Sequence, residues 1–368
     1  MNTGKIKNTI VYVIMNGERK VATLSSVGDV IIYSQQFMPY DLYLEEETDL
    51  DTKLNNLYNF YFWCASRVLP IDRKFIKDIL SSIGATQAVT DKDRARIALS
   101  YHCVSLTDVF WVKTSDENIC FSEINLYDHS LNEAIVPLSL MGKQMTVTNK
   151  ELAADLSTKG CFPKAWIRTE TGFKILKGGD DAVARELLAS KICRCFDFNQ
   201  VLYEPYHYNG QLVSISELIT SKDFSIVTKM AFDIYACNHD IDTIEVCLSL
   251  DPSNYFGMNI LDYLVGNTDR HPENWGFLVD NHTNNCIALH ALMDFNKSFH
   301  AYDTIEGAVC QTSFPARMSQ KEAAVCAVSK IGLRQIQEID PEWFANMPEV
   351  YEMFRTRLEL LKSYEPKV

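Results

Sequence analysis

An acidic residue and an amide five positions apart, Asp269 and Asn274, are the side chains of this 368-residue chain whose spacing best fits chemistry. Phosphoryl-transfer enzymes use this spacing in a loop where the Asp accepts the proton of the attacking hydroxyl and the Asn holds a magnesium ion. Apolar positions from Phe256 to Val265 follow a helical period, and residues 275–279 are typical of a strand. The pair is therefore predicted on a helix-to-strand loop.

A second acidic residue, Asp294, follows an apolar stretch and opens the sequence AspPheAsn. Mg²⁺ prefers octahedral oxygen coordination, and proteins hold it with one or two carboxylates and substrate phosphates. The polar segment 280–285 divides two apolar runs and predicts a hairpin turn. Asn274 and Asp294 are then expected at neighbouring strand ends, close enough to share a metal. AspPheAsn stands where kinases place AspPheGly, and Asn296 is a mild departure, because Asn is the commonest replacement for Gly where a positive backbone φ is wanted.

The segment from Asn267 to Phe277, with Asp294 downstream, resembles the HipA-like serine/threonine kinases, which are relatives of the phosphatidylinositol kinases. The resemblance is carried by the order Asp269, Arg270, His271, because this family places Arg and His after the Asp. It implies a bilobal protein-kinase-like fold, ATP and Mg²⁺ as cofactors, and catalytic roles for these three residues. The alternative for the loop alone is a polar segment with a helix cap.

Such a fold requires a lysine on a strand of the small lobe. Phe173, Ile175 and Lys177 share one face by the strand period of two, which favours Lys177 over Lys174 as the inward-pointing ammonium. In kinases its partners are the nucleotide phosphates and a helix glutamate, which here is Glu186 in the helix predicted over residues 181–196. The alternative is that both lysines are solvated on an edge strand.

A phosphate-covering loop is predicted just before this strand pair, in a small, polar segment with one glycine; the alternative is an ordinary turn. HipA-like kinases autophosphorylate a serine in their phosphate loop, and Ser157 or Thr158 is the matching position. The residues of this predicted loop are Ser157, Thr158, Lys159 and Gly160.

A nucleotide hinge is predicted where the small lobe ends. Residues 201–206 and 211–216 are strand-like, and the AsnGly pair at 209–210 between them is a strong hairpin signal. The second strand is expected to lead into a segment that meets adenine through backbone hydrogen bonds. The predicted hinge residues are Ile215, Ser216 and Glu217.

Composition favours a globular chain, since 47% of residues are hydrophobic and 11% aromatic, which is ample for buried cores. No apolar run is long enough to cross a membrane, and the first residues lack the apolar core of a secretory signal, so a cytoplasmic location is expected. The net charge of −13 opposes direct binding to nucleic acid or to anionic membranes. Eleven cysteines without ligand or framework spacing predict reduced thiols.

The overall prediction is an α+β chain in three parts. Residues 1–145 form an N-terminal α+β domain with a docking or regulatory role, residues 146–218 a mainly β small lobe, and residues 219–368 a large, mainly helical lobe. In the first part we expect a hairpin around Asn16 and Gly17, followed by further helices and strands. These are a strand at 30–33, helices at 49–69, 73–83 and 92–101, and a strand at 105–113.

The resemblance implies transfer of the ATP γ-phosphoryl group to a serine or threonine hydroxyl of a protein substrate. A regulatory protein partner, as in bacterial toxin–antitoxin pairs, is left open. Three alternatives also stay open: a kinase of lipid or small-molecule hydroxyls, a nucleotide-binding module without catalysis, and a transferase of another part of ATP such as AMP.

Overall fold

The structure is a computed structural model, and it describes residues 9–68, 90–128, 140, 163–300, 302–312 and 318–366. Within these residues the chain is α+β, as predicted, and contains three antiparallel sheets. The predicted helix at 73–83 and the predicted phosphate loop at 157–160 lie outside the described residues. The predicted boundaries at 145 and 218 stay predictions.

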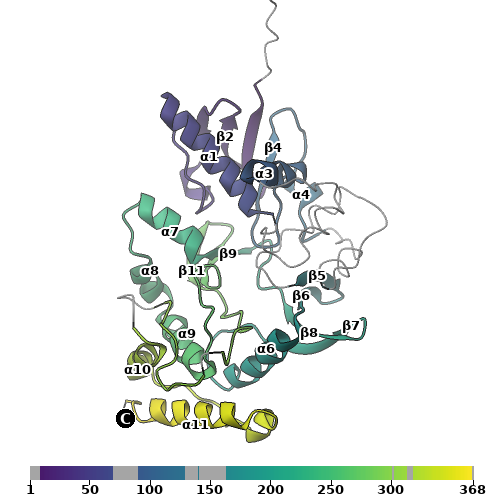
Figure 1. Cartoon of the computed structure of the whole chain (residues 1–368). Helices are drawn as coiled ribbons and strands as arrows, with labels where there is room; N and C mark the ends of the chain where they lie inside the picture. Colours follow the sequence, from purple (N-terminus) through teal and green to yellow (C-terminus); the bar gives the residue numbers. More distant parts are fainter. Residues whose placement is uncertain are drawn as a thin grey trace, which may run out of the picture.

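The N-terminal part holds a sheet of strand order β3-β2-β1-β4, with helix α1 packed against α3 (Figure 1). The predicted hairpin at Asn16 and Gly17 joins the first two strands, and Asp49 caps α1 by accepting a hydrogen bond from the Thr52 amide. The elements are β1 (Val11–Asn16), β2 (Arg19–Ser25), β3 (Val30–Ile32), a 3₁₀ turn (Gln35–Phe37), α1 (Leu50–Ser66), α3 (Asp91–Ser100), β4 (Phe110–Thr114) and α4 (Phe121–Ile124).

The strand predicted from Ser105 is wrong at its start, because β4 begins only at Phe110. Side-chain hydrogen bonds hold the preceding residues in a turn: the Ser105 and Thr107 hydroxyls lie 2.7 Å apart, and Asp108 accepts from the Phe110 amide. Asp108 also forms a buried ion pair with Arg67 at the end of α1. Leu106 and Val109 are apolar and give the turn some strand character, so the sequence alone overestimated the strand.

The small lobe follows the order strand, strand, helix, strand, strand, and its sheet has the order β5-β6-β8-β7. In Figure 1 this sheet lies beside helix α6 of the same lobe. The hairpin between the last two strands turns at Asn209 and Gly210, both with positive φ, as the AsnGly signal predicted. The elements are β5 (Lys164–Thr169), β6 (Gly172–Lys177), α6 (Asp180–Cys193), β7 (Glu204–Tyr208) and β8 (Gln211–Glu217).

The large lobe is mainly helical, as predicted, and carries a small sheet of order β11-β10-β9. The polar segment after Asp280 forms the predicted turn between β10 and β11. Helix α10 begins at a capping box formed by Ser319 and Glu322. The elements are β9 (Phe224–Thr228), α7 (Lys229–Asn238), α8 (Thr243–Leu250), α9 (Pro252–Val265), β10 (Gly276–Asp280), β11 (Asn285–Leu289), α10 (Gln320–Ile331), a 3₁₀ turn (Pro341–Phe344) and α11 (Pro348–Lys362).

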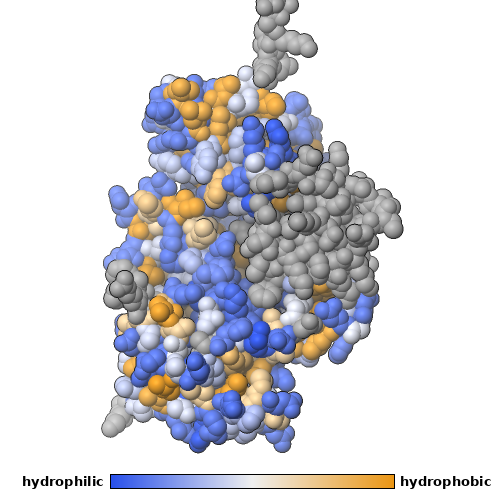
Figure 2. Space-filling view, in the orientation of Figure 1, coloured by the Kyte–Doolittle hydropathy of each residue, from blue (hydrophilic) through white to orange (hydrophobic). Residues whose placement is uncertain are grey.

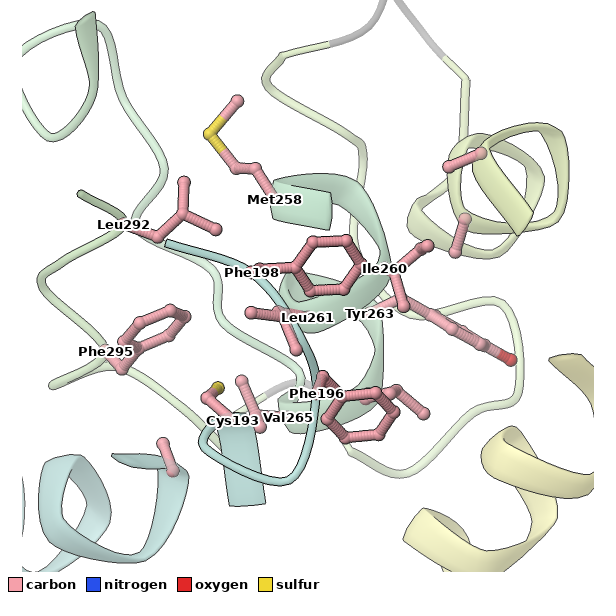
Figure 3. Packing of buried hydrophobic residues seen from close by; sticks show 14 of the residues in the cluster. Cys193, Phe196, Phe198, Met258, Ile260, Leu261, Tyr263, Val265, Leu292 and Phe295 are labelled. Carbon is pink, nitrogen blue, oxygen red and sulfur yellow. The ribbon is translucent and has the colours of Figure 1, made fainter. Parts of the chain in front are cut away.

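Helix α9 is the centre of the large-lobe core, because its residues from Gly257 to Val265 are all buried. Figure 3 shows its side chains surrounded by Phe196, Phe198 and Phe295 from other segments. A Cβ at Gly257 would lie 2.4 Å from the Phe198 ring, so the helix can approach this close only with glycine. The buried helix ends immediately before the predicted catalytic loop and fixes its starting point.

The N-terminal part contacts the large lobe and the connection from the small lobe. Tyr40 donates to the Asn284 carbonyl at 2.7 Å, and the Asn284 amide donates back to the carbonyl of Met38. The Ile226 amide donates to the Thr107 carbonyl at 3.0 Å, and the Thr220 hydroxyl donates to the Leu106 carbonyl. These bonds fix the N-terminal part beside the predicted site.

The surface of the N-terminal part is more apolar than the rest of the face shown in Figure 2. On α1, four large apolar side chains at helical spacing are exposed: Leu50, Leu54, Tyr58 and Phe62. Within the described residues, no helix is long and apolar enough to cross a membrane.

Candidate active site

A cleft of about 490 Å³ lies where the three parts meet, and most of the predicted site residues that the structure describes line it. Its small-lobe wall includes Trp166 and Val201, and its N-terminal wall includes Arg67, Asp108 and Phe62. This N-terminal wall had no counterpart in the sequence prediction. The predicted residues that line the cleft are Lys177, Ser216, Glu217, Asp269, His271, Asn274 and Asp294.

Lys177 ends β6 and points inward, as the strand period predicted. Its ammonium is 2.8 Å from Glu186 Oε1 and 3.0 Å from Asp294 Oδ1, and its side chain is only 10% exposed. It also donates to the Tyr203 hydroxyl at 3.2 Å. Lys174, on the other face of β6, pairs instead with the exposed Glu217. The geometry therefore distinguishes the two lysines in the predicted sense.

Helix α6 presents Glu186 to Lys177 from a fully buried position. Gly179 starts the helix with φ +119°, a conformation that favours glycine, directly after β6. The second carboxylate oxygen of Glu186 accepts from the Ser214 hydroxyl at 2.6 Å. Both oxygens are thus satisfied, which a buried carboxylate requires.

The Lys177, Glu186 and Asp294 side chains form a buried charge cluster with strongly perturbed acidities. Burial alone would lower the pKa of Lys177, but the carboxylates of Asp294 and Glu186 raise it well above its usual value. Burial would raise the pKa of Asp294, yet the nearby cations, Lys177 foremost and then Lys164, hold it well below its usual value. Asp294 is therefore an anion at neutral pH, the form that binds a cation.

The loop after α9 starts at Gly266, which closes the helix with φ +59°. Arg270 is 2% exposed and pairs with both carboxylate oxygens of Asp262, at 2.8 and 2.9 Å. Its other donors reach the carbonyls of Asn274 and Met293. The guanidinium thereby ties the loop to α9 and to the segment before Asp294, so we assign Arg270 a positioning role and not contact with substrate.

Asp269 and Asn274, the pair singled out by spacing, are linked within the loop. The Asn274 amide donates to the Asp269 carbonyl at 2.7 Å. Because this uses Nδ2, the Oδ1 oxygen of Asn274 is the atom left to bind a cation. The Asp269 carboxylate is 2.8 Å from the Lys297 ammonium and 18% exposed, so it remains accessible from the cleft.

The turn at Asp294 differs from the prediction. The positive φ, +66°, belongs to Asp294 itself. Asn296 is not one of the described residues that have a positive φ. The Asn296 amide donates instead to Asp294 Oδ1 at 2.8 Å. The expectation that Asn296 replaces glycine for backbone reasons is therefore wrong, because its side chain is used to hold the carboxylate.

The predicted hinge residues lie at the end of β8. Ser216 and Glu217 line the cleft, while Ile215 packs against the small-lobe cluster that contains Leu176. Two residues beyond the prediction, Leu218 and Ile219, line the cleft as well.

Sequence reasoning missed Tyr203, Lys164 and Lys297, and it missed the role of the Asn296 side chain. The Tyr203 hydroxyl accepts from Lys177 and from the Asp294 amide, and no sequence pattern marks this tyrosine. Lys164 lies opposite Lys177 in the β5–β6 pair and lines the cleft. Lys164 could have been identified from its position next to the predicted phosphate loop. Lys297 could have been identified from its position three residues after Asp294.

The donor set at this end of the cleft fits magnesium. Among the described residues, no group of three or more His, Cys, Asp or Glu side chains is arranged to hold a metal. The set consists of one carboxylate, Asp294, and one amide oxygen, that of Asn274. Mg²⁺ is commonly bound by only one or two protein side chains, with water and substrate phosphates completing its octahedron. Asn274 and Asp294 are therefore the residues that would hold it.

No family model matches the sequence, and no curated protein matches it. Among solved structures, the proinflammatory kinase CtkA of Helicobacter pylori aligns with 56% of this chain and 89% of its own, at 15% identity and a TM-score of 0.41. HipA in the HipA, HipB and operator DNA complex of Shewanella oneidensis MR-1 aligns with 97% of this chain and 92% of its own, at 12% identity and a TM-score of 0.48.

A third solved structure, the CtTel1 dimer, aligns with 88% of this chain but only 16% of its own, at 12% identity and a TM-score of 0.30. Similarities at these values assign neither a family nor an activity. The function is argued below from the cleft itself.

Proposed function

We propose that this chain is an ATP- and Mg²⁺-dependent kinase of the HipA-like kind that phosphorylates a serine or threonine hydroxyl of a protein. The observation that carries the proposal is the convergence of Lys177, Asn274 and Asp294 with Asp269 in one cleft. A cation for phosphates, oxygen ligands for magnesium and an accessible carboxylate for a hydroxyl proton are the groups that phosphoryl transfer needs.

In the proposed reaction the acceptor hydroxyl oxygen attacks the γ-phosphorus, the bond to the β-γ bridging oxygen breaks, and ADP leaves. Asp269 accepts the hydroxyl proton. Lys177 binds the α- and β-phosphates while Glu186 holds its ammonium in place. Asn274 and Asp294 are the residues that would hold Mg²⁺, which when bound would supply neutralisation of phosphate charge.

The apolar part of the cleft suits the nucleotide base. Trp166, Ile175, Val201, Leu218 and Met293 all line it. These side chains come from both lobes, as expected for a planar ring bound between them. Backbone groups near Ser216 and Glu217 would then supply the polar contacts of the hinge.

We assign residues 1–145 to acceptor docking or regulation. This is supported by the N-terminal wall of the cleft, where Arg67, Asp108 and Asp91 accompany the apolar Phe62. A protein acceptor presents polar and apolar groups over a broad surface, which such a mixed wall matches. Phosphorylation of Ser157 or Thr158 and a regulatory protein partner remain predictions of the family resemblance.

The proposal is tested by incubating the full chain with γ-labelled ATP, Mg²⁺ and a bacterial lysate. The parent should label a protein, and Asp269→Asn should lower the labelling rate by about 10²- to 10⁴-fold, the usual contribution of a general base. Asp240→Asn, at an exposed position after α7, is the matched control and should label like the parent. Unchanged labelling by Asp269→Asn would overturn the assignment of the base.

Product analysis separates the alternatives. A mass gain of one phosphate on a protein supports the proposal, and a gain of nucleotide indicates AMP transfer. Label found only in lipid or small molecules indicates a different acceptor class. Measurable ATP binding without any product indicates a nucleotide-binding module that lacks catalysis.

A further inference from the structure

Lys297 forms an ion pair with the proposed catalytic base, Asp269. Its Nζ lies 2.8 Å from Asp269 Oδ1, with the two side chains 39% and 18% exposed. An ion pair this exposed stabilises a fold only weakly, because water and salt screen it. Fold stability therefore gives little reason to place a lysine against this carboxylate.

The turn after Asp294 sets this position. Asp294 adopts φ +66°, and the Asn296 side chain bonds back to its carboxylate, so the chain reverses towards the catalytic loop. Through its ion pair with Asp269, Lys297 connects the segment that carries the proposed metal ligand Asp294 to the loop that carries the proposed base. One short turn thus presents an anion for the metal and, three residues later, a cation at Asp269.

Two other cations near this part of the cleft, Lys177 and Arg270, are already held by partners of their own. Lys177 is bound to Glu186 and Asp294, and the Arg270 guanidinium is buried against Asp262 and two carbonyls. A phosphoryl group that is attacked by a hydroxyl at Asp269 must lie beside that carboxylate. Lys297 is already within hydrogen-bond distance of that carboxylate.

We propose that Lys297 binds the γ-phosphate of ATP. This inference rests on the proposed function and adds to it the residue that recognises the transferred group. An ammonium on a four-carbon stem carries three donors, so it can contact a phosphoryl oxygen while staying near Asp269. In moving towards the phosphate it frees the Asp269 carboxylate to accept the hydroxyl proton.

The test compares the binding of Mg²⁺·AMP-PNP and Mg²⁺·ADP to the full chain by calorimetry. Lys297→Met should lose about ten- to a hundredfold in affinity for the triphosphate analogue, the usual contribution of a charge-assisted hydrogen bond. It should bind ADP like the parent, and Lys297→Arg should recover most of the loss. Lys321→Met removes a comparable ion-paired lysine on α10 and should change neither affinity.

The outcomes separate this inference from the proposed function. If the parent binds both nucleotides and Lys297→Met keeps the same preference between them, the role of Lys297 is overturned and the proposed function stands. Equal loss of both nucleotides also overturns it, because a γ-phosphate contact cannot affect ADP. A parent that binds neither nucleotide overturns the proposed function and this inference together.

Discussion

The Lys177 ammonium on β6 lies 2.8 Å from Glu186 Oε1 on α6, and both side chains are buried. This pair couples a strand and a helix of the small lobe, and the contact of Lys177 with Asp294 extends the coupling to the segment after β11. Removing one partner of a buried ion pair destabilises the fold strongly, because the remaining charge is then buried without a counter-charge.

Replacing Lys177 with Met should therefore destabilise the fold as well as remove nucleotide binding. We expect a loss of about 3–5 kcal/mol in the free energy of unfolding, because Glu186 stays buried without a counter-charge. Lys174→Met, which breaks the exposed pair with Glu217, should cost at most about 1 kcal/mol. Chemical denaturation measures both.

The double variant Lys177→Met, Glu186→Gln supplies the control for this explanation. It removes both charges and should recover much of the lost stability while nucleotide binding stays absent. If the double variant is as unstable as Lys177→Met, loss of packing and not an uncompensated carboxylate explains the effect.

Arg270→Lys should show that the guanidinium positions the catalytic loop. Lysine keeps the charge but cannot bond both oxygens of Asp262 and two carbonyls at once. Leaving buried acceptors unpaired should cost about 2–3 kcal/mol in unfolding free energy. We expect kcat to fall more than nucleotide affinity, because Lys177 and Asp294 are untouched.

The matched control for Arg270→Lys is Arg334→Lys, which alters an exposed pair with Asp197. It should change stability by at most about 1 kcal/mol and leave kcat unchanged. An Arg270→Lys enzyme with parental kcat and stability would contradict the positioning role.

His290 makes the stability of the large lobe depend on pH. Its Nδ1 is 2.9 Å from the Ala291 carbonyl and so carries the proton, while Nε2 is buried without a partner among the described residues. Burial lowers the pKa of His290 to about 4. As pH falls from the unfolded value near 6.5, only the unfolded chain binds the proton, so folding is weakened until about pH 4 and no further.

Unfolding free energies measured between pH 7 and pH 4 should therefore show an excess loss of about 3 kcal/mol in the parent over His290→Asn. Asparagine keeps a donor for the Ala291 carbonyl but does not titrate in this range. His207→Asn, at an exposed position on β7, should follow the parent. Identical pH profiles for the parent and His290→Asn would show that this imidazole is not the group responsible.

Local patterns were sufficient to predict the parts of the site that lie close together in sequence. The five-residue spacing of Asp269 and Asn274 predicted the loop, and the strand period distinguished Lys177 from Lys174. The polar break after Asp280 predicted the hairpin that brings Asn274 and Asp294 to the same end of the sheet. In each case, side-chain periodicity or turn chemistry fixes the geometry within a few residues.

Contacts between distant segments could not be predicted in this way. Tyr203 reaches Lys177 across 26 residues, and the ion pair of Lys297 with Asp269 depends on the backbone turn at Asp294. The N-terminal wall of the cleft depends on Leu106 and Thr107 meeting the segment around Thr220 and Ile226. Only tertiary packing brings such groups together, so one sequence carries no periodic signal for them.

The predictions of a cytoplasmic location, of a regulatory partner and of no direct binding to nucleic acid remain predictions. The ten cysteines among the described residues are free thiols. The role of His271, which lines the cleft, also stays a prediction.

The central claim is that Asn274 and Asp294 hold magnesium beneath a triphosphate bound by Lys177. An experimental structure of the full chain with Mg²⁺ and AMP-PNP tests this most directly. The account predicts a metal ligated by the Asn274 and Asp294 side-chain oxygens and by phosphate, with the phosphates against Lys177. A nucleotide bound elsewhere, or a metal held by other side chains while Asn274 and Asp294 stay apart from it, would contradict the account.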